Sequence, residues 1–242
     1  MGAEAVGVVL AAGMGTRVGA DGNKAYLPLD GRSMLVWSLD TLARVPGIAR
    51  TVLVYRQGES DLARSTVDRE LDGQSGHVAV EFVEGGATRH ASELAMLRHL
   101  EADIESGTVD AVVIHDAARP LADAAMFATA LALAREFGGA LPALPVDGLA
   151  RVGERGVEPV PGSLVRVQTP QAFQARALLD AYRLAERDGF EGTDTSSCIE
   201  RYTDVAVHTF PGSAGNLKVT YAGDIGIAHR LLTERNRLAG PR

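Results

Sequence analysis

The residues best suited to chemistry lie near the N-terminus, where a loop of small residues is followed by two cations. The loop is Ala11-Ala-Gly-Met-Gly-Thr-Arg17, and Lys24 follows seven residues later. The apolar segment 6–10 before it is typical of a buried strand. Small residues let backbone N–H groups approach a phosphate, and the arginine and the lysine would neutralise its charge. A triphosphate needs both, because its charge must be partly cancelled before a phosphorus is attacked.

Two better-known phosphate-binding loops match this segment poorly. A P-loop ends in Gly-Lys-Ser/Thr, but Lys24 is preceded by Asn23 and followed by Ala25. The dinucleotide fingerprint needs a third glycine where Val18 stands, so that match is only partial. An ordinary glycine-rich turn with solvated charges also fits. The loop alone therefore leaves both interpretations open.

The composition suits one α/β domain over residues 1–242, since 46% hydrophobic residues allow a sizeable core. The net charge of −7 predicts no nucleic-acid partner. No apolar run reaches the ~20 residues of a membrane span and the N-terminus lacks a signal pattern, so we expect no membrane partner. The single cysteine, Cys198, suits a reducing cytoplasm, and we expect it to be a core residue.

Apolar, β-branched runs alternate with segments that carry apolar residues at helical spacing. The predicted strands are 6–10, 51–55, 78–83, 111–115 and 139–142, and the predicted helices are 34–43, 58–71, 92–104 and 122–137. This alternation predicts a doubly wound, mostly parallel sheet covered on both faces. Ligands of such sheets bind at the carboxyl ends of the strands. The loops 11–17, 84–89 and 115–120 all follow strands, so we expect them to converge.

Residues 147–162 interrupt the alternation. Two short apolar pieces flank a Gly-x-x-Gly turn between Val152 and Val157, which predicts a projecting β-hairpin. The apolar side of such a hairpin must be buried on something. We therefore expect segment 147–162 to be an arm that joins two copies of the chain as a homodimer.

Three further polar segments could serve a site, and each has a plainer interpretation. Asp116 follows a strand and could hold Mg²⁺ or a substrate hydroxyl, or it could cap the next helix. The Gly85-Gly86 turn could read a base edge, and Ser92 could merely sit in the first turn of the helix that follows. Lys218 lies in an extended apolar segment, where a lysine is usually a solvated edge residue.

The histidines predict no metal site. We expect His115 to be a packed or hydrogen-bonded neighbour of Asp116. The remaining histidines show no metal-ligand spacing and are expected on the surface or in the core: His77, His90, His99, His208 and His229.

Taken together and in this order, the motifs resemble the 2-C-methyl-D-erythritol 4-phosphate cytidylyltransferase family of isoprenoid biosynthesis. The matching stretches span nearly the whole chain: 11–17, Lys24-Ala-Tyr-Leu27, Gly85-Gly-x-x-Arg89, His115-Asp-Ala-Ala-Arg-Pro120, Gln168-Thr-Pro-Gln-Ala-Phe173, Thr193-Asp194 and Asn216-Leu-Lys-Val-Thr220. The resemblance implies a Rossmann-like fold of the nucleotide-diphospho-sugar transferase type, with CTP as substrate and Mg²⁺ as cofactor. An acceptor oxygen would attack the α-phosphorus of CTP, and pyrophosphate would leave.

The resemblance also implies roles for individual residues. The catalytic cations are Arg17, Lys24 and Lys218. The CTP-binding residues are Ala11, Ala12, Gly13, Met14, Gly15, Thr16, Gly85, Gly86, Arg89 and Ser92. The acceptor-binding residues are Asp116, Arg119, Thr193, Leu149 and Arg166, with Asp116 also the candidate metal ligand. No general base is needed, because the attacking phosphate or phosphonate oxygen is already anionic at neutral pH.

The arm departs from the family pattern. The family supplies a threonine and an arginine from the neighbouring subunit to methylerythritol phosphate, and the matching positions here are Leu149 and Pro161. A buried substrate hydroxyl left without a partner costs about 1–3 kcal/mol, so these changes predict a less polar acceptor. Misalignment of the variable arm remains open, with Arg151, Arg155 or Arg166 as a substitute.

The functional hypothesis is therefore a CTP-dependent cytidylyltransferase acting on a small phosphonate or phosphate alcohol. The best candidate is 2-hydroxyethylphosphonate, as in phosphonate antibiotic pathways of the fosfomycin type. The alternative is methylerythritol phosphate itself. A third hypothesis is a nucleotide-binding regulatory domain without catalysis, which the joint presence of Arg17, Lys24, Asp116 and Lys218 disfavours.

Overall fold

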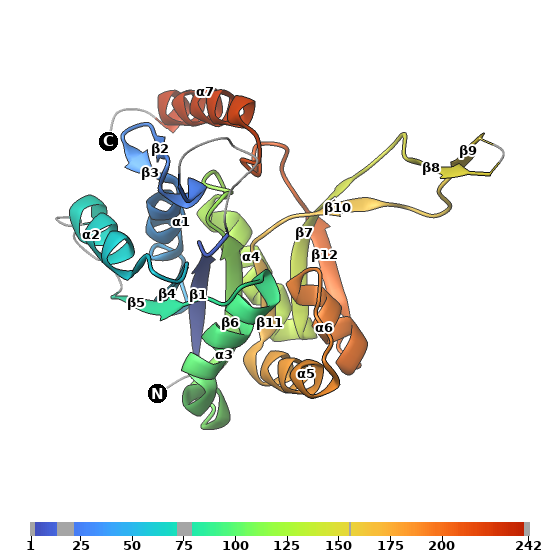
Figure 1. The fold of residues 1–242 in the computed structure, drawn as a ribbon, viewed down its shortest axis with the longest axis horizontal. Coiled ribbons are helices and arrows are strands. Elements are labelled where there is room, and N and C mark those ends of the chain that lie inside the picture. Colours follow the sequence, from blue (N-terminus) through green and yellow to red (C-terminus); the bar gives the residue numbers. More distant parts are fainter. Residues whose placement is uncertain (1–2, 14–21, 72–78, 155, 240–242) are drawn as a thin grey trace.

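A mixed, mostly parallel β-sheet runs through the centre of the molecule, with helices on both faces (Figure 1). The computed structural model describes residues 3–13, 22–71, 79–154 and 156–239. The sheet has the strand order β10-β7-β11-β6-β1-β4-β5, with β12 paired to β7. Its strands are β1 (Glu4–Leu10), β4 (Ile48–Tyr55), β5 (Val80–Glu84), β6 (Val109–Asp116), β7 (Gly139–Pro145), β10 (Val165–Val167), β11 (Gln171–Gln174) and β12 (Val207–Pro211).

The parallel part of the sheet defines where a ligand can bind. Strands β5, β4, β1 and β6 lie side by side and all run parallel. Counted along the chain, this is the order third, second, first, fourth, so the winding reverses between β1 and β6. In open α/β sheets such a reversal leaves a crevice at the carboxyl ends of the two strands. The crevice therefore opens beyond Leu10 of β1 and Asp116 of β6.

Alternation along β1 sends side chains into two separate cores. Val9 packs among residues of α1 (Met34–Leu42), α2 (Ser60–Leu71) and α4 (Ala124–Phe137). Val8 packs among residues of α3 (Arg89–Glu105), α5 (Ala175–Asp188) and α6 (Thr195–Tyr202). Because successive side chains of a strand point to opposite faces, helices are needed on both sides of a strand that is apolar throughout. The predicted doubly wound fold is confirmed.

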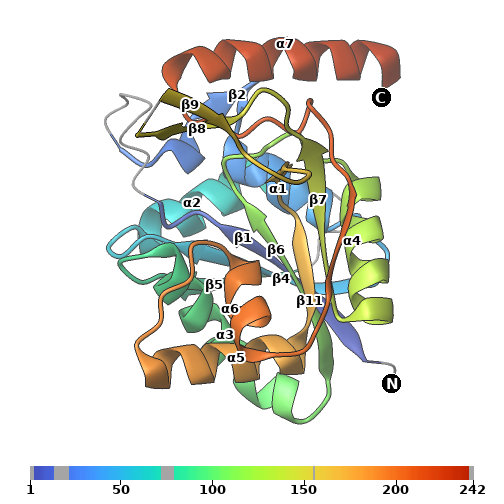
Figure 2. The same ribbon diagram turned by 90° about the vertical axis from the view of Figure 1, so that its right-hand side faces the viewer.

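A third, smaller core lies beyond the strand ends. The long helix α7 (Ala222–Ala239) packs Ala228 and Leu232 against Trp37. Figure 2 shows this helix across the top of the molecule, beside β2 (Pro28–Leu29). The remaining short elements are η2 (Lys24–Tyr26) and β3 (Arg32–Ser33). The packing of α7 holds the segment around Val219, which belongs to this core, over the edge of the crevice.

The predicted arm is present as a projecting hairpin. Strands β8 (Ala150–Gly153) and β9 (Gly156–Pro159) pair with each other in a sheet of their own and extend away from the main body (Figure 1). Val152 is 90% exposed and its cross-strand partner Val157 is 77% exposed. Leu149 and Val165 are also exposed at the base of the arm. A single chain thus leaves this apolar surface uncovered.

Most predicted elements occur within a few residues of their expected ends, with two differences. Strand β11 runs antiparallel to β6 and β7. Short strands such as this were not predicted, because three or four residues carry too little periodicity. The segment 217–220 around Lys218 forms no strand and lies as an irregular chain.

His77 and Val78 lie outside the described residues. Cys198 is buried in the core as expected. No helix in the described part of the chain could cross a membrane.

Candidate active site

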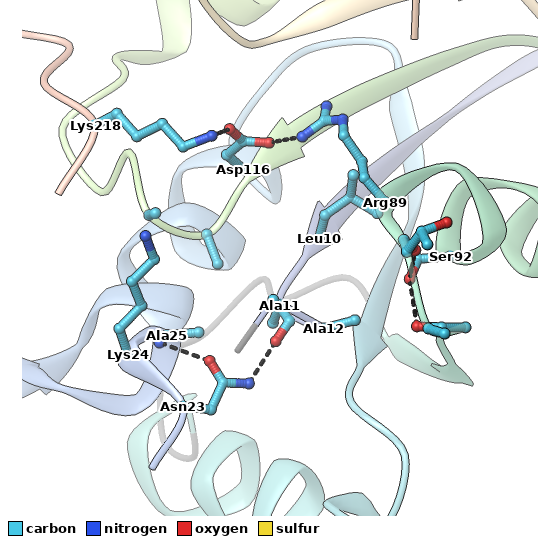
Figure 3. Close-up of a pocket in the computed structure, with 16 residues that line it drawn as sticks. Leu10, Ala11, Ala12, Asn23, Lys24, Ala25, Arg89, Ser92, Asp116 and Lys218 are labelled. Atoms are coloured by element: carbon cyan, nitrogen blue, oxygen red, sulfur yellow. Dashed lines mark hydrogen bonds and ion pairs between the residues drawn. The ribbon is translucent and has the colours of Figure 1, made fainter. Parts of the chain in front are cut away.

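A pocket of about 370 Å³ opens at the carboxyl ends of β1 and β6 (Figure 3). This size is within the usual range for small-molecule sites. The lining residues are Leu10, Ala11, Ala12, Gly13, Asn23, Lys24, Ala25, Gly86, Ala87, Thr88, Arg89, Ser92, Asp116, Ala117, Ala118 and Lys218. The predicted convergence of the three loops is therefore confirmed. Arg17 and the predicted contacts Met14, Gly15 and Thr16 lie outside the described residues.

The Asp116 carboxylate forms the electrostatic centre of the pocket. One oxygen accepts a hydrogen bond from Arg89, and the other accepts one from Lys218 Nζ at 2.7 Å. The side chain is 8% exposed. Burial opposes its ionisation, but the two cations outweigh burial and hold the pKa of Asp116 well below its usual range. Asp116 therefore carries a full negative charge at neutral pH.

The capping interpretation of Asp116 is wrong. Helix α4 begins at Ala124, eight residues later, and its cap is Asp123, whose side chain accepts from the backbone N–H of Met126. Asp116 is consequently available to the pocket.

A buried histidine and a threonine fix the backbone at Asp116. The Asp116 N–H donates to Thr169 Oγ1 at 3.1 Å, and that hydroxyl lies 3.0 Å from His115 Nδ1. His115 Nε2 lies 2.9 Å from the carbonyl oxygen of Arg119. A carbonyl can only accept, so the proton is on Nε2, and Nδ1 accepts from the threonine hydroxyl. Burial lowers the pKa of His115 to about 4, which keeps the ring neutral. The expected role of His115 as a hydrogen-bonded neighbour is confirmed.

Both lysines of the chain lie at the pocket. The sequence contains only Lys24 and Lys218, against 22 arginines. Lys24 Nζ donates to the carbonyl of Val219 at 2.9 Å, which joins the first loop to the segment that carries Lys218. The N–H of Val219 donates to Ala118, so the same segment is also held to the loop after β6. A compact ammonium on a flexible stem suits contact with phosphate oxygens.

Asn23 holds the entry to the pocket. Its Nδ2 donates to the carbonyl of Ala11 at 2.6 Å and to Glu59 at 2.8 Å. Its Oδ1 accepts from the N–H of Ala25 and so caps the short helix that begins at Lys24. The stretches on either side of residues 14–21 are thereby fixed to each other.

The glycine turn before α3 is tightly packed against the first loop. A Cβ added to Gly85 would lie 2.7 Å from the Ala12 Cβ and 2.8 Å from Ser92 Oγ, so a side chain cannot fit. Ser92 Oγ donates to the carbonyl oxygen of Thr88 at 2.8 Å, and the carbonyl oxygen of Gly86 also lies within hydrogen-bond distance of it, at 3.3 Å. Ser92 therefore sits in the first turn of α3, as its plainer interpretation expects, and it also lines the pocket. A contact of this turn with a base stays a prediction.

Four predicted acceptor residues do not line the pocket of a single chain. Arg119 is buried, and its guanidinium donates to the carbonyl of Asn216 at 2.8 Å, which anchors the segment leading to Lys218. Thr193 is exposed just before α6. Leu149 and Arg166 are exposed on and beside the arm. Their contacts with an acceptor stay predictions.

Two features of the site were missed by sequence reasoning. Thr169 belongs to a matching motif, but its contacts with His115 and Asp116 depend on a loop that is distant in sequence. Glu93 is buried behind Arg89, 3.1 Å from its Nε. The four-residue spacing of Arg89 and Glu93 on a helix was the signal that could have found this pair.

The family model for 2-C-methyl-D-erythritol 4-phosphate cytidylyltransferase matches residues 5–234. The chain belongs to this family. A Cereibacter sphaeroides 2-C-methyl-D-erythritol 4-phosphate cytidylyltransferase is 39% identical over 230 residues, covering 93% of this chain and 95% of that protein. The Acidobacterium capsulatum protein of the same name is 33% identical, covering 95% and 97%.

Solved structures of the family share the fold. The Anaerococcus prevotii 4-diphosphocytidyl-2C-methyl-D-erythritol synthase has a TM-score of 0.80 at 25% identity, covering 96% of each chain. The Thermus thermophilus 2-C-methyl-D-erythritol 4-phosphate cytidylyltransferase has a TM-score of 0.70 at 29% identity, covering 93% of this chain and 98% of that one. As a member of the family, this protein is a nucleotidyltransferase of the cytidylyltransferase class, which disfavours the non-catalytic hypothesis.

Replacing either lysine with alanine should lower kcat by about 100- to 1,000-fold, the usual effect of losing one preorganised donor to developing charge. Steady-state pyrophosphate release measures this, with the thermal unfolding midpoint as the check on folding. Arg176→Ala is the matched control, because it removes a 61% exposed cation paired with Asp180. Near-normal turnover in either lysine variant would show that the lysine does not act on the reacting phosphates.

Proposed function

We propose that the protein transfers the cytidylyl group of CTP to 2-C-methyl-D-erythritol 4-phosphate and releases pyrophosphate. Family membership and the names of the relatives support this acceptor. The single observation that carries the chemistry is the ionised Asp116 between Arg89 and Lys218 in a pocket that also holds Lys24. This pocket gathers cations around one carboxylate at the nucleotide crevice of a doubly wound sheet.

The reaction needs positioning and charge stabilisation more than proton transfer. An anionic acceptor phosphate oxygen forms a new bond to the α-phosphorus, and the bond from that phosphorus to the β-phosphate bridging oxygen breaks. The electron pair leaves with pyrophosphate. Lys24 and Lys218 would stabilise the charge that accumulates on the phosphoryl oxygens, as phosphoryl transfer generally requires. The acceptor oxygen carries no proton at neutral pH, so no base has to be assigned.

The wall formed by Gly86 and Ser92, with Gly85 packed beside it against Ala12, is our candidate for the cytosine site. The Gly85 position has no room for even a methyl group, so the backbone lies close against Ala12. Backbone groups in a narrow slot can pair with the amino donor and carbonyl acceptor of cytosine, while a purine would be too large. We therefore propose CTP rather than ATP or GTP as the donor.

Mg²⁺ would be held by Asp116 together with phosphate oxygens of the nucleotide. Asp116 is the sole carboxylate among the described residues that line the pocket. No group of three or more metal-binding side chains occurs in the described part of the chain. One carboxylate fits Mg²⁺, which commonly takes one or two carboxylates plus substrate phosphates and water. The ion would supply further neutralisation of the triphosphate charge.

The names of the relatives and the sequence of the arm suggest different acceptors. We expected a small phosphonate from Leu149 and Pro161, but the relatives favour methylerythritol phosphate. 2-Hydroxyethylphosphonate stays as the second candidate, because an exposed leucine offers no hydrogen bond to a polyol.

The cytoplasmic location suggested by the single cysteine stays a prediction.

The acceptor is tested by kcat/KM for methylerythritol phosphate and 2-hydroxyethylphosphonate, each with CTP and Mg²⁺ under identical conditions. We expect at least a tenfold preference for methylerythritol phosphate, about the value of one good substrate contact. A preference of that size for the phosphonate would overturn the proposed acceptor. The same assay with ATP and GTP checks the donor, and comparable rates with either would contradict the cytosine site.

We also propose that two chains associate through the arm. The paired Val152 and Val157 leave a contiguous apolar surface exposed in a single chain, and such surfaces usually mark an interface.

Sedimentation velocity at micromolar concentration should therefore show a dimer, and the double variant Val152→Asp/Val157→Asp should sediment as a monomer with reduced acceptor turnover. Leu62→Asp is the control, because it changes an exposed apolar residue on α2. A wild-type monomer with full activity would contradict the arm interface.

A further inference from the structure

A buried carboxylate lies directly behind the Asp116 site. Glu93 in α3 is 1% exposed and does not belong to the pocket lining. Its two oxygens accept hydrogen bonds from the hydroxyls of Tyr182 at 2.5 Å and Thr195 at 2.6 Å. These partners come from α5 and from the first residue of α6. The carboxylate thus joins three helices on one face of the sheet.

Arg89 lies between this carboxylate and the pocket. Its Nη1 donates to Asp116, and its Nε lies 3.1 Å from Glu93 Oε1. The Nε contact does not have hydrogen-bond geometry, so it is a charge interaction. The resulting series runs from Thr195 and Tyr182 through Glu93 and Arg89 to Asp116. Lys218 completes it on the far side of Asp116.

A carboxylate at this position is unfavourable unless it is paired. Burial, the largest effect, together with the nearby charge of Asp116 raises the pKa of Glu93 above its usual value, although Arg89 and the two hydroxyls act in the opposite direction. The two hydroxyl groups satisfy both oxygens from behind, so the charge of Glu93 faces a single cation. Core packing alone would be served as well by an apolar residue. We therefore attribute the charge of Glu93 to its effect on Arg89, which it restrains from the side opposite to Asp116.

We propose that Glu93 is a positioning residue for cytidylyl transfer: it fixes the Arg89 guanidinium on Asp116, and through Asp116 it fixes Lys218. Glu93 touches neither substrate. The inference rests on the proposed function only for its kinetic test. Without the charge of Glu93, Arg89 can turn toward incoming phosphates, and Asp116 then loses one of the two cations that set its orientation.

The first test is a double-mutant cycle on steady-state cytidylyl transfer. Glu93→Gln keeps the shape and an oxygen acceptor while removing the charge. We expect it to lower kcat about tenfold with the KM for CTP changed less than about threefold, because the loss affects orientation in the transition state. In an Arg89→Met background the same substitution should add less than about twofold. Equal tenfold losses in both backgrounds, or no loss in the wild type, would overturn the proposal.

Two controls separate positioning from stability. Asp40 in α1 is another buried carboxylate, which lies away from the pocket and pairs with Arg32 and Arg44. The control Asp40→Asn removes its charge. It should lower the unfolding midpoint without changing kcat. Tyr182→Phe removes one hydroxyl from Glu93 but keeps the ring that stacks on His90, and it replaces Glu93→Gln if that variant does not fold. It should lower kcat in the same direction by about threefold, and an unchanged kcat would count against the proposal.

The second test does not depend on the acceptor. Side-chain ¹⁵N NMR should show an ordered Arg89 guanidinium signal, assigned by its loss in Arg89→Met. This signal should shift or broaden in Glu93→Gln and stay unchanged in Asp40→Asn. If it changes while neither acceptor is turned over, the proposed function fails and the positioning role stands. An unchanged signal would overturn the positioning role.

Discussion

The ion pairs of Asp116 are the interaction on which the site depends. A carboxylate with 8% of its side chain exposed stays ionised only because Arg89 and Lys218 bind its two oxygens. The three residues come from the end of β6, the start of α3 and the segment before α7. One charge therefore holds together three parts of the chain that are distant in sequence. It also leaves the pocket with an excess of cations in a protein whose net charge is −7.

The sheet places this charge, and uncharged hydrogen bonds hold it in place. Asp116 is the last residue of β6, opposite Leu10 of β1, where the winding of the sheet reverses. A neutral His115 lies between the Thr169 hydroxyl and the Arg119 carbonyl, and Thr169 accepts from the N–H of Asp116. Burial keeps the His115 ring uncharged, so the core holds no unpaired charge beside Asp116. Burial therefore supplies the fixed, neutral support that a preorganised site needs.

The sequence was sufficient to predict the parallel part of the fold, because β1, β4 and β6 are continuous apolar runs that need cover on both faces. The convergence of three loops followed from that topology. The short strands β10, β11 and β12 were not predictable from periodicity, and their place in the sheet depends on tertiary contacts. The irregular path of the segment at Lys218 was missed for the same reason, since contacts with Ala118, Lys24 and Arg119 hold it.

The site residues also divide into those that sequence motifs identify and those whose contacts only the fold creates. Asp116 and Lys218 were found from motifs, but their pairing depends on how α7 and β6 pack. Glu93 was overlooked because a glutamate on a helix is usually solvated, and only the three-dimensional fold buries it between Tyr182 and Thr195. The arm was recognised as a hairpin, whereas the proposed association of two chains through it concerns an assembly that one chain does not contain.

The central claim is that the charge of Asp116 organises the pocket, and Asp116→Asn tests it most directly, because asparagine keeps the shape and removes the charge. The measurement is kcat/KM for CTP in pyrophosphate release, with the unfolding midpoint as the check on folding. We predict a fall of about 100-fold or more in a folded variant, comparable to the loss of a preorganised electrostatic group. A value within about threefold of the wild type would contradict the account, because a single buried charge would then have no part in transition-state stabilisation.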